Sequence, residues 1–162
     1  MNIRFNNRML SLKLGLLVFA LSAIIVLSVM NPILMGKKIE KREKVVIERL
    51  YIIRNAELRY RQINGRYCSS IDSLAMAGFI ADSIKYIPFS NRSKFKIKAI
   101  EKNFKGNTND FMECSALYDD YLNGLNEDVI NETKQQALKR GDFPGLRFGD
   151  IEHQSDNIGN WE

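Results

Sequence analysis

The chain has 162 residues, of which 45% are hydrophobic, and a formal net charge of +5. Once a membrane segment is subtracted, this length leaves room for one modest domain and not for two. The basic excess does not indicate nucleic-acid binding, because much of it flanks one apolar segment, where basic side chains meet lipid headgroups.

The first predicted element is a membrane-spanning helix over residues 14–35, after a basic segment over residues 1–13 that we expect to be cytoplasmic. The apolar run has no charged residue and is about 33 Å long, enough to cross a hydrocarbon core of about 30 Å. Its large apolar side chains favour insertion by roughly 3 to 7 kcal/mol. A cleaved signal peptide is the alternative, but the run exceeds the usual length of roughly 7–15 residues and ends without a small-x-small cleavage site.

Basic residues lie on both sides of this run, and their distribution bears on orientation. Three precede the run and five follow it, namely Arg4, Arg8 and Lys13, then Lys37, Lys38, Lys41, Arg42 and Lys44. Taken alone, the count favours a cytoplasmic C-terminal domain.

A long helix is predicted from Lys37 to Ile63, after a kink or brief break at Asn31-Pro32. Its apolar side chains recur every three, four or seven residues, and a second set widens the stripe, which favours packing on a sheet. The first set is Ile39, Val46, Leu50, Ile53 and Tyr60, and the second is Val45, Ile52, Ala56 and Ile63. Asn64-Gly65 predicts the end of this helix.

A second, shorter helix is predicted through Asp72 and Leu74, capped by Ser69 or Ser70 and closed by Gly78. The period then changes to two, which predicts a strand. Its inward residues are Phe95, Ile97 and Ala99, alternating with Lys94, Lys96 and Lys98. Lys105-Gly106-Asn107 predicts a turn, and residues 111–116 return as the antiparallel partner.

The last part of the chain predicts helices over residues 117–125 and 129–139, the second ended by Gly141, and a short strand over residues 146–148. We expect a loosely held polar tail over residues 153–162, except where Trp161 docks. The predicted fold class is therefore α+β. An N-terminal transmembrane helix continues into a long amphipathic helix, packed on a small antiparallel sheet with short flanking helices, and the domain covers residues 36–152.

Three segments, Ala56–Tyr60, Asn64–Tyr67 and Ser70–Leu74, resemble type IV pilins and type II secretion pseudopilins over roughly residues 14–116. In that family a membrane helix continues into a long helix that ends in an N-G-x-Y turn, before a short helix and a small antiparallel sheet. The matching residues are Tyr60, Asn64, Gly65, Tyr67, Asp72 and Leu74. We expect Gly65 to end the helix in the left-handed conformation and the Tyr67 ring to fold back over it.

The resemblance implies a single-pass protein of the bacterial inner membrane with an extracytoplasmic domain, against the lysine and arginine count. The chain departs from the family at the leader-peptidase motif, because Gly15 lies inside the apolar run and Ala20 stands where a glutamate is expected. Residues 144–149 and 157–162 also resemble uncharacterised bacterial membrane-anchored proteins of similar length.

Residues capable of chemistry are few. His153 is the single histidine and lies in the polar tail, and no catalytic, cofactor or metal motif surrounds it. Cys68 and Cys114 form one disulfide if the domain faces an oxidising compartment and the two residues meet; burial as small apolar side chains is the alternative.

The sequence thus predicts a non-enzymatic, membrane-anchored structural or assembly component without a cofactor. Its expected partners are membrane lipid and other membrane-anchored subunits, in a homo- or hetero-oligomer, and no nucleic acid. The alternative is a membrane-tethered ligand- or peptide-binding or sensor module of the cell envelope.

Overall fold

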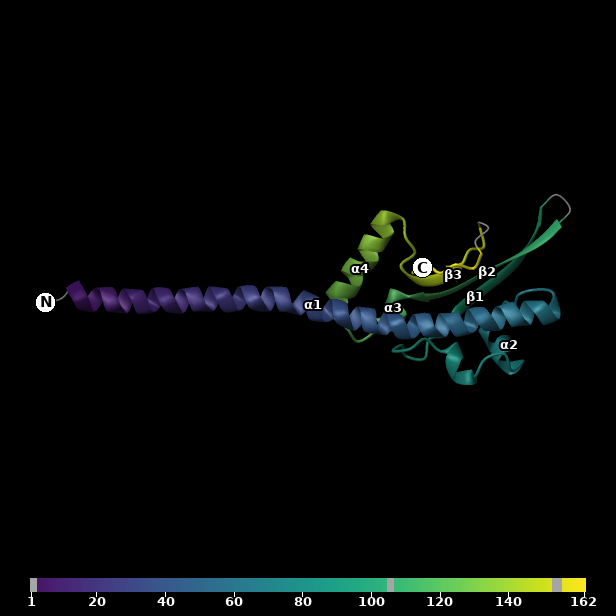
Figure 1. Cartoon of the computed structure of the whole chain (residues 1–162), viewed down its shortest axis with the longest axis horizontal. Helices are drawn as coiled ribbons and strands as arrows, with labels where there is room; N and C mark the ends of the chain where they lie inside the picture. Colours follow the sequence, from purple (N-terminus) through teal and green to yellow (C-terminus); the bar gives the residue numbers. More distant parts are fainter. Residues whose placement is uncertain (1–2, 105–106, 153–155) are drawn as a thin grey trace. The chain divides into compact units, whose positions relative to one another are not determined.

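The protein is α+β, with an N-terminal apolar helix, a long helix, a small three-stranded antiparallel sheet and short helices (Figure 1). The computed structural model describes residues 3–104, 107–152 and 156–162. The chain divides into two compact units, Met1–Glu40 and Lys41–Glu162. Helix α1 (Ile3–Asn64) contributes to both of them.

The first unit contains a helical stretch, Met9–Val26, that is long and apolar enough to span a membrane and has none of its length buried by protein. Ser22 in this stretch and Ser28 just after it are satisfied inside the helix, since Ser22 donates to the carbonyl of Val18 and Ser28 to that of Ile24, both at 2.8 Å. These hydroxyls therefore add little to the cost of transfer into hydrocarbon, and the charged residue of the stretch, Lys13, lies near its start, where a long basic side chain reaches the interface.

Helix α1 is uninterrupted at Pro32, so of the two predicted alternatives at Asn31-Pro32 the brief break is wrong, and the kink stays a prediction. Proline removes one backbone donor, but the hydrogen bonds on either side of it are enough to keep a long helix continuous. Helix α1 begins at Ile3, so the described residues 3–13 of the basic segment are helical as well, and their cytoplasmic location stays a prediction.

The part of α1 in the second unit buries a narrow stripe of side chains. Val46, Leu50, Ile53 and Glu57 follow one another at spacings of four, three and four residues and are all fully buried, as is typical of one helix face. The expected widening of the stripe is wrong at its far edge, where Ile52 is 43% exposed and Ile63 is 74% exposed. Glu57, and not Ile63, continues the buried face.

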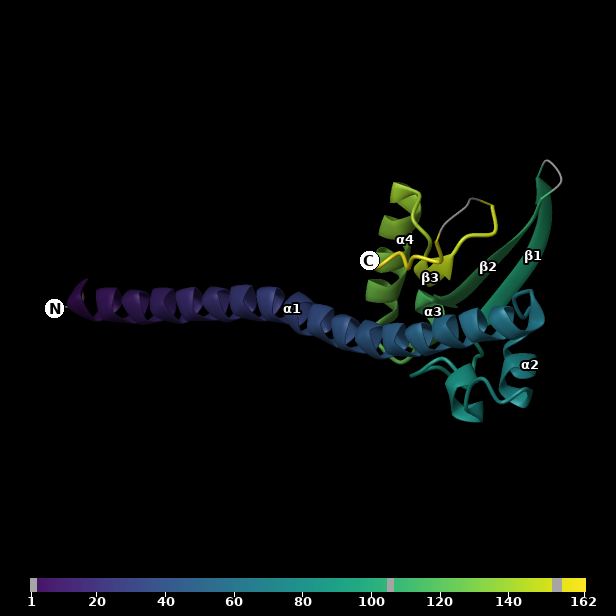
Figure 2. The same cartoon turned by 45° about the vertical axis from the view of Figure 1, so that its right-hand side comes forward.

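The sheet consists of β1 (Lys96–Phe104), β2 (Asn107–Leu117) and β3 (Gly145–Gly149), in the order β1-β2-β3 and antiparallel throughout. Within the second unit, α1 lies between the sheet and the segment that carries α2 (Ile71–Met76), as both views show (Figures 1 and 2). The inner side chains of the sheet are mostly buried with those of α1: Met112, Cys114, Ala116, Leu146 and Phe148. The predicted hairpin is confirmed, while Lys105 and Gly106 of its turn lie outside the described residues.

The predicted helix caps are confirmed. Ser70 caps α2, its hydroxyl accepting from the backbone of Ser73 at 3.3 Å. Helix α4 (Glu127–Arg140) ends at Gly141 with φ 78°. Helix α3 (Tyr118–Tyr121) is shorter than the helix predicted over residues 117–125. A 3-10 turn, η1 (Asp82–Lys85), was not predicted.

The described residues of the tail, 156–162, are fixed to the domain, so the expectation of a loose tail is wrong for them. Phe148 of β3 forms a bridge with Gly159. The amide of Gly149 donates to Ile158 at 3.1 Å, and the amide of Asn160 to Arg147 at 2.9 Å. The tail therefore lines the outer edge of β3.

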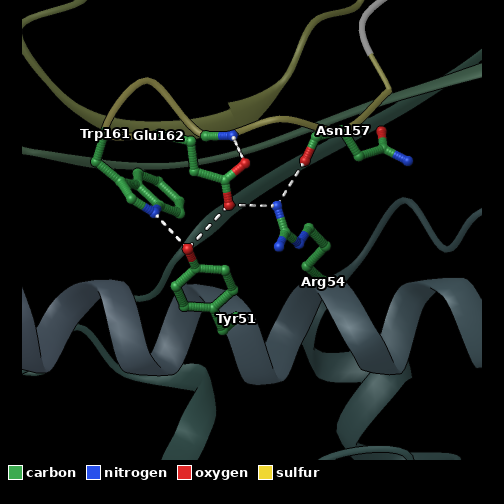
Figure 3. Close-up of polar contacts among 6 residues, drawn as sticks. Tyr51, Arg54, Asn157, Trp161 and Glu162 are labelled. Carbon is green, nitrogen blue, oxygen red and sulfur yellow. Dashed lines mark hydrogen bonds and ion pairs between the residues drawn. The ribbon is translucent and has the colours of Figure 1, made fainter.

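Side chains of the tail also bind α1 (Figure 3). The Glu162 carboxylate accepts from the Tyr51 hydroxyl and from Arg54, each at 2.9 Å. The indole of Trp161 donates to the same hydroxyl at 3.1 Å and lies edge-on to the Tyr51 ring, with centroids 5.7 Å apart. The Tyr51 hydrogen bond and the Arg54 charge lower the pKa of Glu162, and the expected docking of Trp161 is confirmed.

Candidate functional site

The turn that ends α1 has the geometry that the N-G-x-Y pattern predicts. Gly65 is left-handed, with φ 76°, and its amide donates to the carbonyl of Arg61 at 2.8 Å. Tyr67 is 7% exposed, and the Arg61 guanidinium lies over its ring, 4.9 Å from the centroid. Its hydroxyl also accepts from Asn157 of the tail at 2.9 Å. The expected fold-back of Tyr67 is therefore confirmed, and the tail adds to it.

The other residues of this motif stabilise the fold around the turn. Tyr60 packs edge-on against Phe79, with ring centroids 5.2 Å apart, and Asn64 donates to the Tyr60 carbonyl at 3.0 Å. Asp72 pairs with Lys94 at 2.7 Å, which lowers the pKa of that carboxyl. Leu74 is fully buried. Of these residues, Tyr60 and Tyr67 line one cleft, whereas Asn64, Gly65, Asp72 and Leu74 are not part of its lining.

Glu57 is a buried carboxyl beneath the same turn. It is fully buried, and its Oε2 accepts from the backbone amide of Cys68 at 2.9 Å, while its Oε1 has no hydrogen-bond partner among the described residues. Burial raises the pKa of this carboxyl from 4.5 to about 7, against the opposing effect of the Cys68 amide. Because this pKa is close to neutral pH, Glu57 gains or loses its proton there, and the charge of the core changes with it.

Both cysteines are free and buried in the structure, with Cys68 5% exposed and Cys114 fully buried. Burial raises the pKa of each thiol, and the negative charge of Glu57 raises both further. The thiols therefore stay protonated and poorly nucleophilic at neutral pH. Their pairing in an oxidising compartment stays a prediction.

A cleft of about 260 Å³ opens between this turn and the β1–β2 hairpin. Its walls come from the end of α1 and the turn, from the start of α2, and from the two strands. The lining residues are Tyr60, Arg66, Tyr67, Cys68, Ser69, Ser73, Ala99, Ile100, Glu101, Asp110 and Phe111. The cleft therefore lies beside the middle of β1, at Ala99–Glu101, and beside its partner residues Asp110 and Phe111 on β2.

The charges of the cleft are only partly compensated. Asp110 pairs with Arg61, which lies outside the lining, at 3.4 Å. Arg66 and Glu101 are exposed and form no ion pair or hydrogen bond with any residue that the structure describes. Burying a charged side chain under a ligand is favourable only when a ligand group of opposite charge pairs with it. The cleft therefore offers one cation, Arg66, and one anion, Glu101, to a ligand.

The basic residues after the apolar helix do not all face lipid. Arg42 donates to the carbonyls of Tyr121 at 3.0 Å and Asn123 at 2.7 Å, and its guanidinium lies 4.9 Å from the Phe89 ring centroid. The expectation that headgroup contact alone accounts for these residues is therefore wrong for Arg42, which fixes α1 to the loop after α3.

Among the residues that the structure describes, no group of three or more His, Cys, Asp and Glu residues could hold a metal ion. His153 lies outside the described residues. Asp119 and Glu127 stand in the first turns of α3 and α4, where a negative charge stabilises the helix dipole.

Sequence reasoning missed Glu57, the cleft and the fixed tail. The burial of Glu57 could have been predicted, because it lies four residues after Ile53 and so on the same apolar face of α1. The cleft and the tail contacts join residues far apart in the chain, and no local pattern indicates them. Comparisons with known protein families, with curated proteins and with solved structures found no match for this chain.

Proposed function

We propose that this chain is a membrane-anchored, non-enzymatic structural or assembly component with a pilin-like domain. The observation that carries the proposal is the stretch Met9–Val26, which is helical, uncharged apart from Lys13, and unburied by the rest of the protein. Such a surface is unfavourable in water and favourable in hydrocarbon. The helix anchors the chain and packs against the apolar helices of other subunits.

The pilin-like assignment is supported by the order of elements and by the turn at Gly65 and Tyr67. A long helix, a short helix and an antiparallel sheet follow in that order, and Tyr67 closes over the helix end. On this assignment the domain lies outside the bacterial inner membrane. Its surface then contacts neighbouring membrane-anchored subunits, in a homo- or hetero-oligomer, while the helix contacts lipid.

The non-enzymatic part of the proposal is supported by the environment of the buried titratable groups, while the carboxyls that do line the cleft, Glu101 and Asp110, have no histidine beside them in the described lining. Glu57 and Cys114 lie in the core and do not line the cleft, and the thiol of Cys68 is kept protonated by its surroundings. General acid or base catalysis needs a titratable group within hydrogen-bond reach of a substrate.

Anchoring is tested by placing arginines in the apolar stretch. One arginine costs roughly 2.5 to 3.5 kcal/mol at the centre of a membrane helix, so one is too few against an insertion energy of roughly 3 to 7 kcal/mol, and two are needed. We expect the double variant Val18→Arg, Leu21→Arg to leave the membrane fraction on alkaline carbonate extraction. The control Val18→Leu, Leu21→Val stays in the pellet. A wild-type chain found in the supernatant would refute the anchor.

Assembly is tested with a photo-crosslinking amino acid at Phe19, whose side chain is 77% exposed. With two differently tagged copies expressed together, we expect an adduct that carries both tags, or an adduct with a second anchored protein. The same crosslinker at Lys139, an exposed residue of the domain, reports contacts of the domain surface. Adducts with lipid alone at both positions contradict the assembly proposal.

A further inference from the structure

The cleft between the end of α1 and the β1–β2 hairpin has the size of a site for a small metabolite. Its volume of about 260 Å³ is that of roughly nine water molecules in the liquid. Sites for drug-sized ligands run from about 300 to 1,000 Å³, so this cleft suits a molecule smaller than those.

The free charges of the cleft have opposite signs and come from different elements. Arg66 extends from the turn after α1, and Glu101 lies on β1. Neither is paired with a described residue, whereas the other acidic lining residue, Asp110, is held by Arg61. A ligand that satisfies both free charges needs a carboxylate for Arg66 and an ammonium group for Glu101.

The rest of the lining consists of aromatic rings and hydroxyls. Tyr60, Tyr67 and Phe111 supply ring surface, and Ser69 and Ser73 supply hydroxyl groups to the same lining as Arg66. The rings are held in place by other contacts, since Tyr60 packs on Phe79 and Tyr67 is fixed by Arg61 and Asn157. Ring surface held in this way binds an apolar side chain without a large loss of conformational freedom.

We propose that this cleft binds a small zwitterion with an apolar side chain, of the α-amino-acid class. The carboxylate pairs with Arg66 and receives hydrogen bonds from the serines, the ammonium group pairs with Glu101, and the side chain lies on the rings. The same end groups occur on a free amino acid and on a short peptide. This inference goes beyond the proposed function and does not depend on how the chain is anchored.

The test is calorimetric titration of the full chain in detergent micelles with four probes. These are L-phenylalanine, phenethylamine, which lacks the carboxylate, 3-phenylpropionate, which lacks the ammonium group, and glycyl-L-phenylalanine. We expect saturable binding of phenylalanine or of the dipeptide, and at least tenfold weaker binding of the two probes with one charge, because each leaves a charged group of the cleft unpaired. Tighter binding of L-phenylalanine would identify the ligand as a free amino acid, and tighter binding of glycyl-L-phenylalanine would identify it as a short peptide.

The variants assign each charge to its residue. Arg66→Gln is expected to lower the affinity for the zwitterion about tenfold and to remove its advantage over phenethylamine, and Glu101→Gln to remove its advantage over 3-phenylpropionate. The matched controls Lys139→Gln and Glu48→Gln change exposed charges away from the cleft and leave all affinities unchanged. Absence of saturable binding by both zwitterions, or binding that neither cleft variant weakens, overturns the proposal.

Discussion

Glu57 occupies a position in the core where the neighbouring members of its stripe, Val46, Leu50 and Ile53, are aliphatic. A buried carboxylate is costly unless it is paired, and here its described hydrogen-bond partner is the amide of Cys68. That single bond joins the last turns of α1 to the segment after Tyr67. The residue thus combines a local stabilising contact with a cost that depends on pH.

Replacement of Glu57 by glutamine is expected to remove a pH dependence of stability. The pKa of Glu57 is 4.5 when unfolded and about 7 when folded, so the folded chain binds the extra proton between these values. Its free energy of unfolding then falls as pH rises from 4.5 to 7, by about 3 kcal/mol in all. Glu57→Gln keeps an acceptor for Cys68 and cannot ionise, so it is more stable than wild type at pH 8 and similar at pH 4.

The measurement is urea unfolding of the full chain in micelles at several pH values, followed by the fluorescence of Trp161, the single tryptophan. The thiols of Cys68 and Cys114, which share the charge environment of Glu57, have raised pKa values and do not titrate in this window. The exposed control Glu48→Gln keeps the wild-type slope. Equal slopes for wild type and Glu57→Gln would contradict this assignment.

At the scale of elements, the contact between β2 and β3 depends on glycine. Gly149 is left-handed, with φ 72°, and a Cβ built on it would lie 2.1 Å from the carbonyl oxygen of Met112. Gly141, at the end of α4, has a similar φ of 78° but open space where its Cβ would lie. The two positions share one kind of backbone strain and differ in the room for a methyl group.

We therefore expect Gly141→Ala to lower the free energy of unfolding by about 1 kcal/mol, the usual cost of a left-handed alanine. Gly149→Ala has the same conformational cost, and its methyl group must also push β3 away from the Met112 carbonyl oxygen of β2. We expect it to lower the free energy of unfolding by a total on the order of 3 kcal/mol. Urea midpoints of the two variants, measured side by side, give the comparison. Similar losses would mean that the β2–β3 contact is looser than the structure has it.

The elements that were predicted correctly are those with local causes. Alternation of Phe95, Ile97 and Ala99 with lysines predicts β1, and Gly141 predicts the end of α4, because period and cap are properties of neighbouring residues. The fixed tail depends on Arg54 and Tyr51, which lie more than a hundred residues away in the chain. The cleft depends on two hairpin strands meeting one turn, and no pattern in either segment contains that information.

At the scale of the whole molecule, the open question is on which side of the membrane the domain lies. The count of lysines and arginines around the apolar run favours the cytoplasmic side, whereas the pilin resemblance implies the extracytoplasmic side. The native thiols are too buried to report it, at 5% and 0% exposed, whereas Met76 is 85% exposed. We expect Met76→Cys to react with a membrane-impermeant maleimide in intact cells, since we propose an outward-facing domain. Wild type, as the control, stays unlabelled in the same cells.

Labelling of Met76→Cys only after the cells are lysed would contradict the outward placement. It would support a cytoplasmic domain, which the five basic residues after the apolar run favour on their own. The proposed zwitterion site is unaffected by either result, but the compartment that supplies its ligand would change.

The contact of the tail residues 157–160 with β3 has a consequence for how copies of this chain can join. The tail occupies the outer side of β3 through an isolated bridge and two backbone hydrogen bonds, so a strand of a second copy cannot pair there without displacing it. Strand β3 covers β2 only over residues 113–117, so the side of residues 107–112 of β2 that faces away from β1, and the outer side of β1, have no strand partner among the described strands. Copies that join by backbone pairing are therefore expected to meet at the β1–β2 hairpin and not at the C-terminus.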